Sequence, residues 1–530
     1  MPARDSFDYV VVGAGSAGAV IAARLTEDPS VRVLLLEAGG PADADEISIP
    51  AAFAALFKTR WDWNYSTTEQ KQLNSGRKYW PRMKALGGCS SMNAMVYIRG
   101  NRADYDTWRD QYGATGWGYD DVLPYFVRAE GNTRLGAPYH GQDGPLHVED
   151  RRYTHPLSHA WVESAVAHGF KPTDDFNGAE QEGTGLYQVT CKKGRRWSVD
   201  NAYLQPAIGR DNLTVRTGAL VSRVVVDKGR AVGVAYLLGR EERIAYVDRE
   251  VVLSGGAVNS PQVLLLSGIG PAAHLREVGV DVVLDLPGVG QNLHDHPAYP
   301  LIWHTKGTTD LAEHNNLVNF AKAKAAGRGP LVSNVAEAGA FFRSHDDLAA
   351  PDLQVHMAPS GFWDNGLHEP TTRKVTVAPT LVNVASRGQL RLRSTDPRWH
   401  PDIDPAYYDD QVDLDAMVVG GMRLIETVQS GPFARLVDRP FMPGQKVPTE
   451  SELVEHIRRE TQTLYHPVGT CAMGTGDQAV VDPELRVRGI DGLRVADASV
   501  MPIVPRGNTN APTIMVGEKA ADLLKGKAKA

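Results

Sequence analysis

The sequence of 530 residues has few cysteines, no basic block and no long apolar run. Its three cysteines, Cys89, Cys191 and Cys471, are widely spaced, which argues against a disulfide framework or a CxxC metal site and favours a reducing compartment. A net charge of −7 without a basic stripe makes nucleic acid an unexpected partner. The chain enters a strand within its first ten residues and has no run of eighteen apolar residues. We therefore expect a cytoplasmic protein without a signal peptide or a transmembrane segment.

A glycine motif follows the first apolar strand, which is predicted at about residues 9–12. Gly13 permits a tight turn, Gly15 lets the backbone approach a pyrophosphate, and Gly18 allows a helix to pack closely on the strand. The N-terminus of that helix offers free N–H groups and a positive dipole to phosphates. Glu37 ends the next apolar strand, where a carboxylate suits the hydroxyls of an adenosine ribose. These features predict a Rossmann-like dinucleotide site and, alone, do not separate FAD from NAD.

Three later segments share glycines and small residues with polar side chains between them. Residues 83–108 contain GGCSSMNAM, residues 255–270 read GGAVNSPQVLLLSGIG with a helix predicted at residues 262–266, and the C-terminal part contains YHPVGTCAMG and NTNAPTIMVGEKAADLL. With the N-terminal motif, these segments resemble the glucose-methanol-choline (GMC) family of FAD-dependent oxidoreductases, in its choline dehydrogenase and aryl-alcohol oxidase branch. The resemblance runs from residue 9 to residue 524.

The resemblance implies an α/β fold, with an FAD-binding Rossmann-like domain and a discontinuous α+β substrate-binding domain. A chain of this length also exceeds the ~250–300 residues at which single cores stop growing. We expect the FAD-binding domain to comprise residues 5–150, 198–296 and 449–526. The substrate-binding domain is then formed by residues 151–197 and 297–448, which lack glycine phosphate loops.

The catalytic residues implied by the resemblance are His466 and Asn510. His466 precedes a proline, so it is expected in a loop or at a strand end, where its imidazole can accept the hydroxyl proton of an alcohol. Asn510 can orient the same oxygen. It also stands before Pro512 at a predicted helix start, whose dipole would stabilise negative charge on the reduced flavin.

The resemblance also implies a set of FAD contacts along the chain. Met92 stands where the choline oxidase branch has a histidine linked to the flavin, and Ala94 replaces a serine of that branch, so we expect FAD to be non-covalent. The expected FAD-binding residues are Gly13, Gly15, Ser16, Ala17, Gly18, Glu37, Ala38, Gly88, Ser91, Asn93, Ala94, Met95, Val96, Val221, Asp497, Ala498 and Asn510.

Five residues are expected to contact the substrate. Glu337 and His356 match pocket positions of choline-oxidising relatives, and Trp61, Trp363 and Tyr465 could surround a quaternary ammonium or an aryl ring. We favour oxidation of an aryl or other apolar primary alcohol with O2 as acceptor. Choline oxidation with a quinone or another acceptor, and a hydroxynitrile lyase with non-redox FAD, are the alternatives. The sequence leaves the oligomeric state open.

The segment LHDHP, with His294, Asp295 and His296, offers two imidazoles and a carboxylate. A metal site needs three or four ligands and a supporting shell, so we interpret this loop as a structural element and expect no metal.

Overall fold

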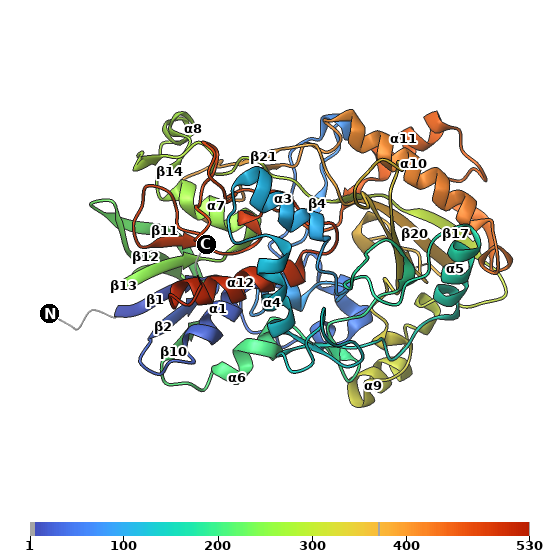
Figure 1. Cartoon of the computed structure of the whole chain (residues 1–530), viewed down its shortest axis with the longest axis horizontal. Helices are drawn as coiled ribbons and strands as arrows, with labels where there is room; N and C mark the ends of the chain where they lie inside the picture. The colour runs from blue at the N-terminus through green and yellow to red at the C-terminus, as the bar shows by residue number, and fades with distance from the viewer. Residues whose placement is uncertain (1–5, 369–370, 529–530) are drawn as a thin grey trace.

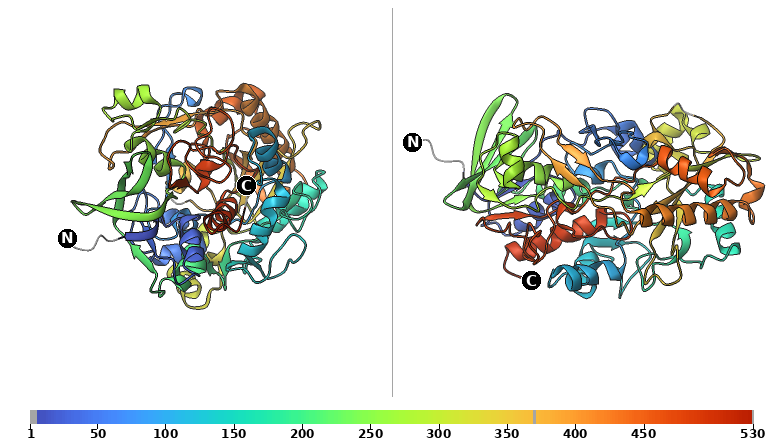
Figure 2. Two further views of the ribbon diagram at one scale, coloured as in Figure 1. Left: turned by 60° about the vertical axis from the view of Figure 1, so that its left-hand side comes forward. Right: turned by 90° about the horizontal axis from the view of Figure 1, so that it is seen from above.

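The computed structural model describes residues 6–368 and 371–528 and has an α/β architecture with two main sheets (Figure 1). Residue 5, the first of the expected FAD-binding domain, lies outside the described residues. Figures 1 and 2 show the two sheets in opposite halves of the long axis, with the N-terminal strand and the C-terminal helix in the same half. Segments from both ends of the chain therefore lie together in the same half of the molecule.

The first sheet has the strand order β10-β2-β1-β13-β12-β11, with β25 also paired to β13. Strand β13 is long enough to pair antiparallel with β12 at its start and parallel with β1 and β25 at its end. The buried runs of Val and Leu in β1, in β2 and at the end of β13 suit a sheet that is covered on both faces. The strands are β1 (Ser6–Val12), β2 (Val33–Leu36), β10 (Leu213–Arg216), β11 (Ala219–Asp227), β12 (Arg230–Leu238), β13 (Glu241–Leu253) and β25 (Leu493–Val495).

Two helices from opposite ends of the chain pack together beside this sheet. Helix α1 (Gly18–Leu25) follows the glycine motif, and α12 (Asn510–Leu524) packs against both α1 and α4 (Tyr119–Ala129). Gly517 of α12 allows this approach, because a Cβ there would lie 2.9 Å from the Ala17 carbonyl oxygen. Both helices begin near the C-terminal end of β1.

The second sheet is antiparallel and has the order β23-β17-β20-β19-β18-β7, with the short strands β16 and β24 attached. Helices α5 (Pro156–Ala167) and α10 (Gln411–Val428) pack on its strands. The strands are β7 (Gly183–Leu186), β16 (Pro297–Ala298), β17 (Leu301–Thr305), β18 (Ala338–Phe342), β19 (Leu353–Ala358), β20 (Lys374–Leu381), β23 (Val437–Met442) and β24 (Gln462–Thr463).

The residues just before His466 lie with the second sheet. Strand β24 pairs with β16, and α11 (Glu450–Glu460) packs on α10 through its buried Leu453 and Ile457. The expected FAD-binding domain includes residues 449–526, and these bounds stay a prediction. In the structure the chain returns towards the first sheet only after β24, because the apolar face of α11 is buried against α10.

Helix α7 (Gly256–Leu266) starts six residues earlier than its proline suggested. Pro261 lies inside the helix and cannot donate a hydrogen bond to the Ala257 carbonyl. The hydroxyl of Thr470 donates to that carbonyl oxygen at 2.7 Å instead. The C-terminal loop thereby replaces the hydrogen bond that the proline removes.

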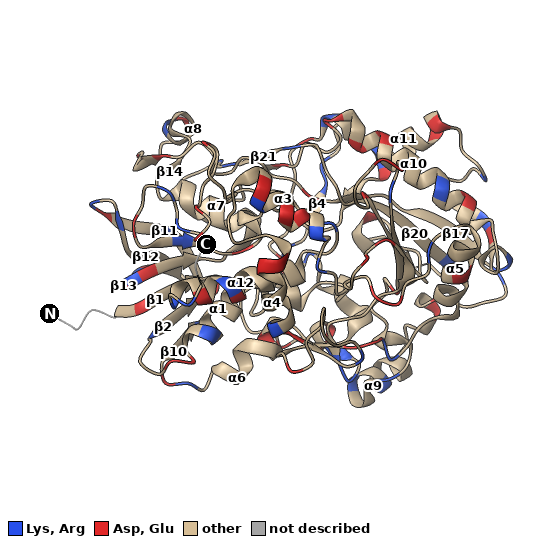
Figure 3. Cartoon of the chain, in the orientation of Figure 1, with Lys and Arg blue, Asp and Glu red and all other residues tan. Residues whose placement is uncertain are grey.

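Acidic and basic residues are interspersed along the elements, as the red and blue segments of Figure 3 show. Across residues 6–368 and 371–528, no helix is long and apolar enough to cross a bilayer. The same residues contain no group of three or more His, Cys, Asp or Glu side chains placed to hold a metal ion.

Candidate active site

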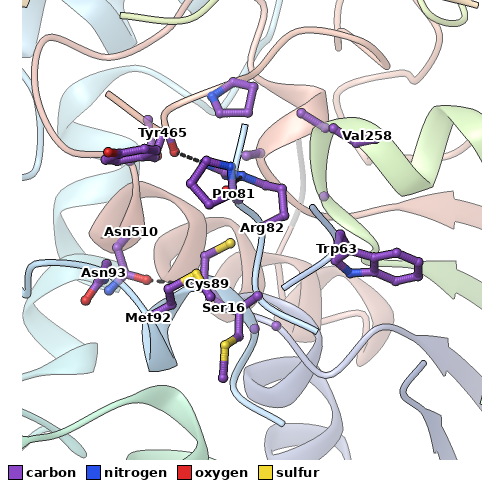
Figure 4. Close-up of a pocket in the computed structure, with 18 of the residues that line it drawn as sticks. Ser16, Trp63, Pro81, Arg82, Cys89, Met92, Asn93, Val258, Tyr465 and Asn510 are labelled. Atoms are coloured by element: carbon purple, nitrogen blue, oxygen red, sulfur yellow. Dashed lines mark hydrogen bonds between the residues drawn. The ribbon is translucent and has the colours of Figure 1, made fainter. Parts of the chain in front are cut away.

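A large cavity lies between the two sheets, and its wall joins segments from the whole length of the chain. The glycine motif, residues 88–96 and the start of α12 form one part of the wall, and residues 462–467 form another. Figure 4 shows Tyr465 and Arg82 on one side of this cavity, with Met92, Cys89 and Asn93 beneath them in this view.

Two glycines of the N-terminal motif, Gly13 and Gly18, are required by close approaches. Gly13 has a φ of +98°, and a Cβ there would lie 2.5 Å from the Ser254 carbonyl oxygen. A Cβ on Gly18 would lie 1.9 Å from the Gly13 carbonyl oxygen, so only glycine lets α1 pack on this turn. Gly15 faces open space, with Gly88 at 3.9 Å as its nearest neighbour. The motif therefore opens a bare stretch of backbone into the cavity, as a phosphate group requires.

Glu37 lies at the other edge of this part of the cavity, where β2 ends. Its carboxylate accepts hydrogen bonds from the backbone N–H groups of Ala14, at 2.9 Å, and Gly39, at 2.8 Å. Burial raises the pKa of Glu37, while these hydrogen bonds act in the opposite direction. The carboxylate is thus fixed beside the glycine motif and can accept hydrogen bonds from ribose hydroxyls.

Most of the expected FAD-binding residues line this cavity, and two do not. Gly18 packs inside the strand–helix turn, and the hydroxyl of Ser91 donates to the Leu86 carbonyl oxygen at 3.0 Å, within its own loop. The expected residues that line the cavity are Gly13, Gly15, Ser16, Ala17, Glu37, Ala38, Gly88, Asn93, Ala94, Met95, Val96, Val221, Asp497, Ala498 and Asn510.

Asn508, and not Asn510, lies against the imidazole of His466. The Asn508 amide nitrogen is 3.3 Å from His466 Nε2, and its amide oxygen accepts a hydrogen bond from Gln354 Nε2 at 3.2 Å. Asn510 is the first residue of α12, and its oxygen accepts a hydrogen bond from the Ser16 hydroxyl at 2.8 Å. The structure therefore corrects the expected partner of His466 by two residues, because the helix start turns Asn510 towards the glycine motif.

The backbone before His466 is held in an uncommon conformation. Tyr465 has a φ of 69°, in the left-handed region that bulky residues rarely adopt. Its N–H donates to Thr463 Oγ1 at 2.7 Å, its carbonyl oxygen accepts from Arg82, and its hydroxyl donates to Asn365 Oδ1 at 2.8 Å. Figure 4 shows the contact with Arg82 as a dashed line. These hydrogen bonds fix the direction in which the His466 side chain projects from the backbone.

Asp295 contacts the backbone of His466, and His296 contacts its imidazole. The buried carboxylate of Asp295 accepts hydrogen bonds from the His466 N–H at 2.7 Å and from the hydroxyls of Tyr407 and Thr463, each at 2.5 Å. His296 Nδ1 lies 3.0 Å from His466 Nδ1. Our sequence interpretation treated this loop as structural and missed that it touches the imidazole, since contacts across 170 residues leave no local signal.

The imidazole of His466 is kept neutral by its surroundings. Burial lowers its pKa well below the ordinary value, and positive charge on His296, His356 or Arg82 would lower it further. A neutral imidazole is the form that accepts a proton near neutral pH. The arrangement can therefore take a hydroxyl proton from a substrate at Nε2, beside the amide of Asn508.

The part of the cavity beyond His466 is lined mainly by apolar and aromatic side chains. Tyr465 and His356 line it as expected, and burial lowers the pKa of His356 to about 4. Three phenylalanines that we had not singled out, Phe53, Phe57 and Phe362, are also in its wall. Their rings pack with Tyr465 and with one another, at centroid distances of 5.9 to 6.1 Å.

Three of the expected substrate residues do not line the cavity. Trp61 is covered by the Arg60 guanidinium, and Trp363 stacks on His368 and contacts Phe441. Glu337 is buried just before β18 of the second sheet, where its carboxylate accepts hydrogen bonds from the Ser158 and Ser333 hydroxyls and the His155 N–H at 2.6 to 2.7 Å. A carboxylate with three inward donors is stable there, whereas facing an apolar cavity would leave it unpaired.

A family model described as GMC oxidoreductase matches residues 7–298, and a second with the same description matches residues 384–517. The chain belongs to the GMC oxidoreductase family. Human mitochondrial choline dehydrogenase is 43% identical to it, with 99% of this chain and 90% of that protein covered. An alcohol dehydrogenase (acceptor) of Pseudomonas putida is 42% identical, with 98% and 96% covered. Pyridoxine 4-oxidase from Mesorbium loti, a solved structure, has a TM-score of 0.90 at 30% identity, with 99% of this chain and 100% of that chain covered.

As a GMC oxidoreductase, the enzyme is a flavoprotein that uses FAD. The cavity fits this cofactor, because it combines an open glycine backbone, a ribose-facing carboxylate and the N-termini of α1 and α12. Met92 lines the cavity and offers a thioether, which does not form the covalent flavin bond of a histidine. These relatives are oxidoreductases, and the hydroxynitrile lyase alternative gains no support from them.

Proposed function

We propose that this GMC oxidoreductase oxidises a primary alcohol with an aryl or other apolar substituent to the aldehyde. The observation that supports this most is the pairing of His466 and Asn508 with an aromatic wall that holds Phe53, Phe57 and Phe362. Glu337, the carboxylate expected opposite a cationic substrate, does not line the cavity and is bound by two serine hydroxyls. An apolar group beside the carbinol carbon is the substituent that such a wall binds best.

His466 and Asn508 have different roles in the oxidation of the alcohol. His466 Nε2 accepts the hydroxyl proton, and its neutral form is favoured by burial. Asn508 donates its amide N–H to the same oxygen, which holds the carbinol carbon in one orientation. FAD, when bound, supplies the acceptor for the hydride that leaves this carbon. The alcohol thus loses one proton and one hydride to become the aldehyde.

Choline is the second candidate. The aromatic rings around Tyr465 could receive a quaternary ammonium group through cation–π attraction without a carboxylate. The 43% identity with human choline dehydrogenase also favours it. For the electron acceptor we propose O2, with a quinone or another acceptor as the alternative. The relative from Pseudomonas putida, an alcohol dehydrogenase (acceptor), favours the latter. We also propose the cytoplasm as its location, which fractionation of cells would test.

The test is anaerobic reduction of the bound flavin, which is measured as the loss of its yellow colour. The panel contains benzyl alcohol, cinnamyl alcohol, hexanol, pyridoxine and choline, with tert-butanol as control because it has no hydrogen on its carbinol carbon. We expect fast bleaching by the aryl alcohols and none by tert-butanol. Bleaching by choline alone would replace the proposal with the second candidate. Readmitting air, or adding a quinone, to the reduced enzyme then compares the two acceptors by the rate of reoxidation.

A further inference from the structure

Arg196 is a buried cation without a carboxylate partner. It lies on β9 (Arg195–Arg196), is only 4% exposed, and forms no salt bridge with any described residue. Other buried arginines are paired: Arg99 with Glu130, and Arg494 with Glu250. An unpaired buried charge is costly, and burial lowers the pKa of Arg196 to about 10, which still leaves it charged at neutral pH.

The guanidinium of Arg196 is directed at the segment that forms the cofactor cavity. Its Nε donates to the Ile47 carbonyl oxygen at 2.8 Å, and its Nη1 donates to the Ser90 carbonyl oxygen at 3.2 Å and to Asn93 Oδ1 at 2.7 Å. Its Nη2 is buried without a hydrogen-bond partner in the part of the chain that the structure describes. The positive charge is therefore one side chain away from the cavity.

Asn93 connects Arg196 to the cavity. Its amide oxygen accepts from Arg196 and also from the Met95 N–H at 3.0 Å, so both of its lone pairs are used. The amide group cannot flip without losing both bonds, and its NH₂ is left as the group available to the cavity that Asn93 lines. A donor that is polarised by a cation binds an acceptor on an anionic ligand more strongly.

We propose that Arg196 is a positioning residue for FAD, which holds the Asn93 amide as a donor towards the cofactor and supplies the positive charge that favours its reduced, anionic form. FAD carries a negatively charged diphosphate, and two-electron reduction with uptake of one proton adds a further negative charge to the ring. The missing counter-ion of Arg196 is thus the cofactor itself. This inference depends on FAD binding and not on which alcohol is oxidised.

The test is the midpoint potential of the flavin in the holoenzyme, measured against a redox dye, for Arg196→Met. We expect the variant to lose about tenfold more affinity for reduced than for oxidised FAD, which lowers the two-electron potential by about 30 mV. The rise in Tm on adding FAD to the apoprotein should also be smaller than in the wild type. Arg196→Lys, which retains the charge, should recover most of the potential.

Arg151→Met is the matched control. Arg151 also lacks a salt bridge among the described residues, has an unpartnered Nε, and bonds to the Tyr187 carbonyl oxygen, but it does not line the cavity or touch Asn93. The Arg151→Met variant should leave the midpoint potential of the flavin unchanged, even if it lowers the Tm. An unchanged potential in Arg196→Met would overturn the proposal. If Arg196→Met does not fold, Asn93→Ala decides in its place, because the proposal requires a lower potential there too and an unchanged one refutes it.

Discussion

The cofactor half and the substrate half of the cavity are built by different means. Around the glycine motif the wall is mostly backbone, and Gly13 and Gly18 are each fixed by a contact that a Cβ would break. Around Phe53, Phe362 and His466 the wall is made of side chains from segments hundreds of residues apart. Backbone constraints require particular residues at fixed local spacings in the sequence. An aromatic wall requires only side chains of suitable size and polarity, whatever their positions. The first half is therefore readable in a sequence, and the second half determines the substrate.

His466 stands where the two halves meet, and its loss gives the largest expected effect. In His466→Ala the rate of anaerobic flavin reduction by the best alcohol should fall by roughly 10²–10⁴-fold, because the proton acceptor is removed. The cofactor half does not use this imidazole, so the absorbance spectrum of bound FAD should remain. Stopped-flow absorbance measures the rate. An alcohol that reduces the variant at the wild-type rate would exclude His466 as the base.

Variants of Asn508 and Asn510 distinguish the substrate half of the cavity from the cofactor half. Asn508→Ala should slow flavin reduction by roughly 5–100-fold, as expected for a hydrogen bond of about 1–3 kcal/mol. Asn510→Ala should instead weaken FAD binding, because it removes the contact with Ser16. Titration of apoprotein with FAD and stopped-flow reduction distinguish the two effects. The opposite assignment of effects would restore Asn510 as the catalytic partner.

Glu337→Gln tests whether this carboxylate belongs to the substrate half at all. The amide would place an NH₂ group among three donors, so stability should fall by about 1–3 kcal/mol, which is read as a lower Tm with saturating FAD. The ratio of reduction rates for choline and benzyl alcohol should stay the same. A selective loss of activity with choline would show that the carboxylate does meet the substrate.

The smallest expected effect is a shift in pH dependence. His466 is a proton acceptor only above its pKa, so the reduction rate should be flat through neutral pH and fall at acid pH. Arg82 is one of the positive groups that lower this pKa. In Arg82→Met the pKa should rise, and the acid limb should move to higher pH. Arg60→Met, which changes an exposed arginine on Trp61, is the control and should leave the profile unchanged.

The sequence predicted the fold class and FAD, because both depend on local patterns or family motifs. Glu37 and His466 line the cavity, and their roles stay predictions. The sequence misplaced the partner of His466 by two residues, since Asn508 and Asn510 stand in the same short segment and only the start of α12 decides which one faces the imidazole. It also chose Trp61 and Trp363 over Phe53 and Phe362. Which aromatic side chains converge on a cavity depends on tertiary packing that no spacing records.

The contact between Ser16 and Asn510 also has a consequence for how the enzyme is made. These residues are 494 positions apart, so at ~5–20 residues per second the glycine motif waits roughly 25–100 s on the ribosome for its partner. During that time the faces of α1 and α4 that pack on α12 are uncovered. We therefore expect stable binding of FAD only after the chain is complete, and a polypeptide that ends before α12 should leave these faces open to chaperones and proteases.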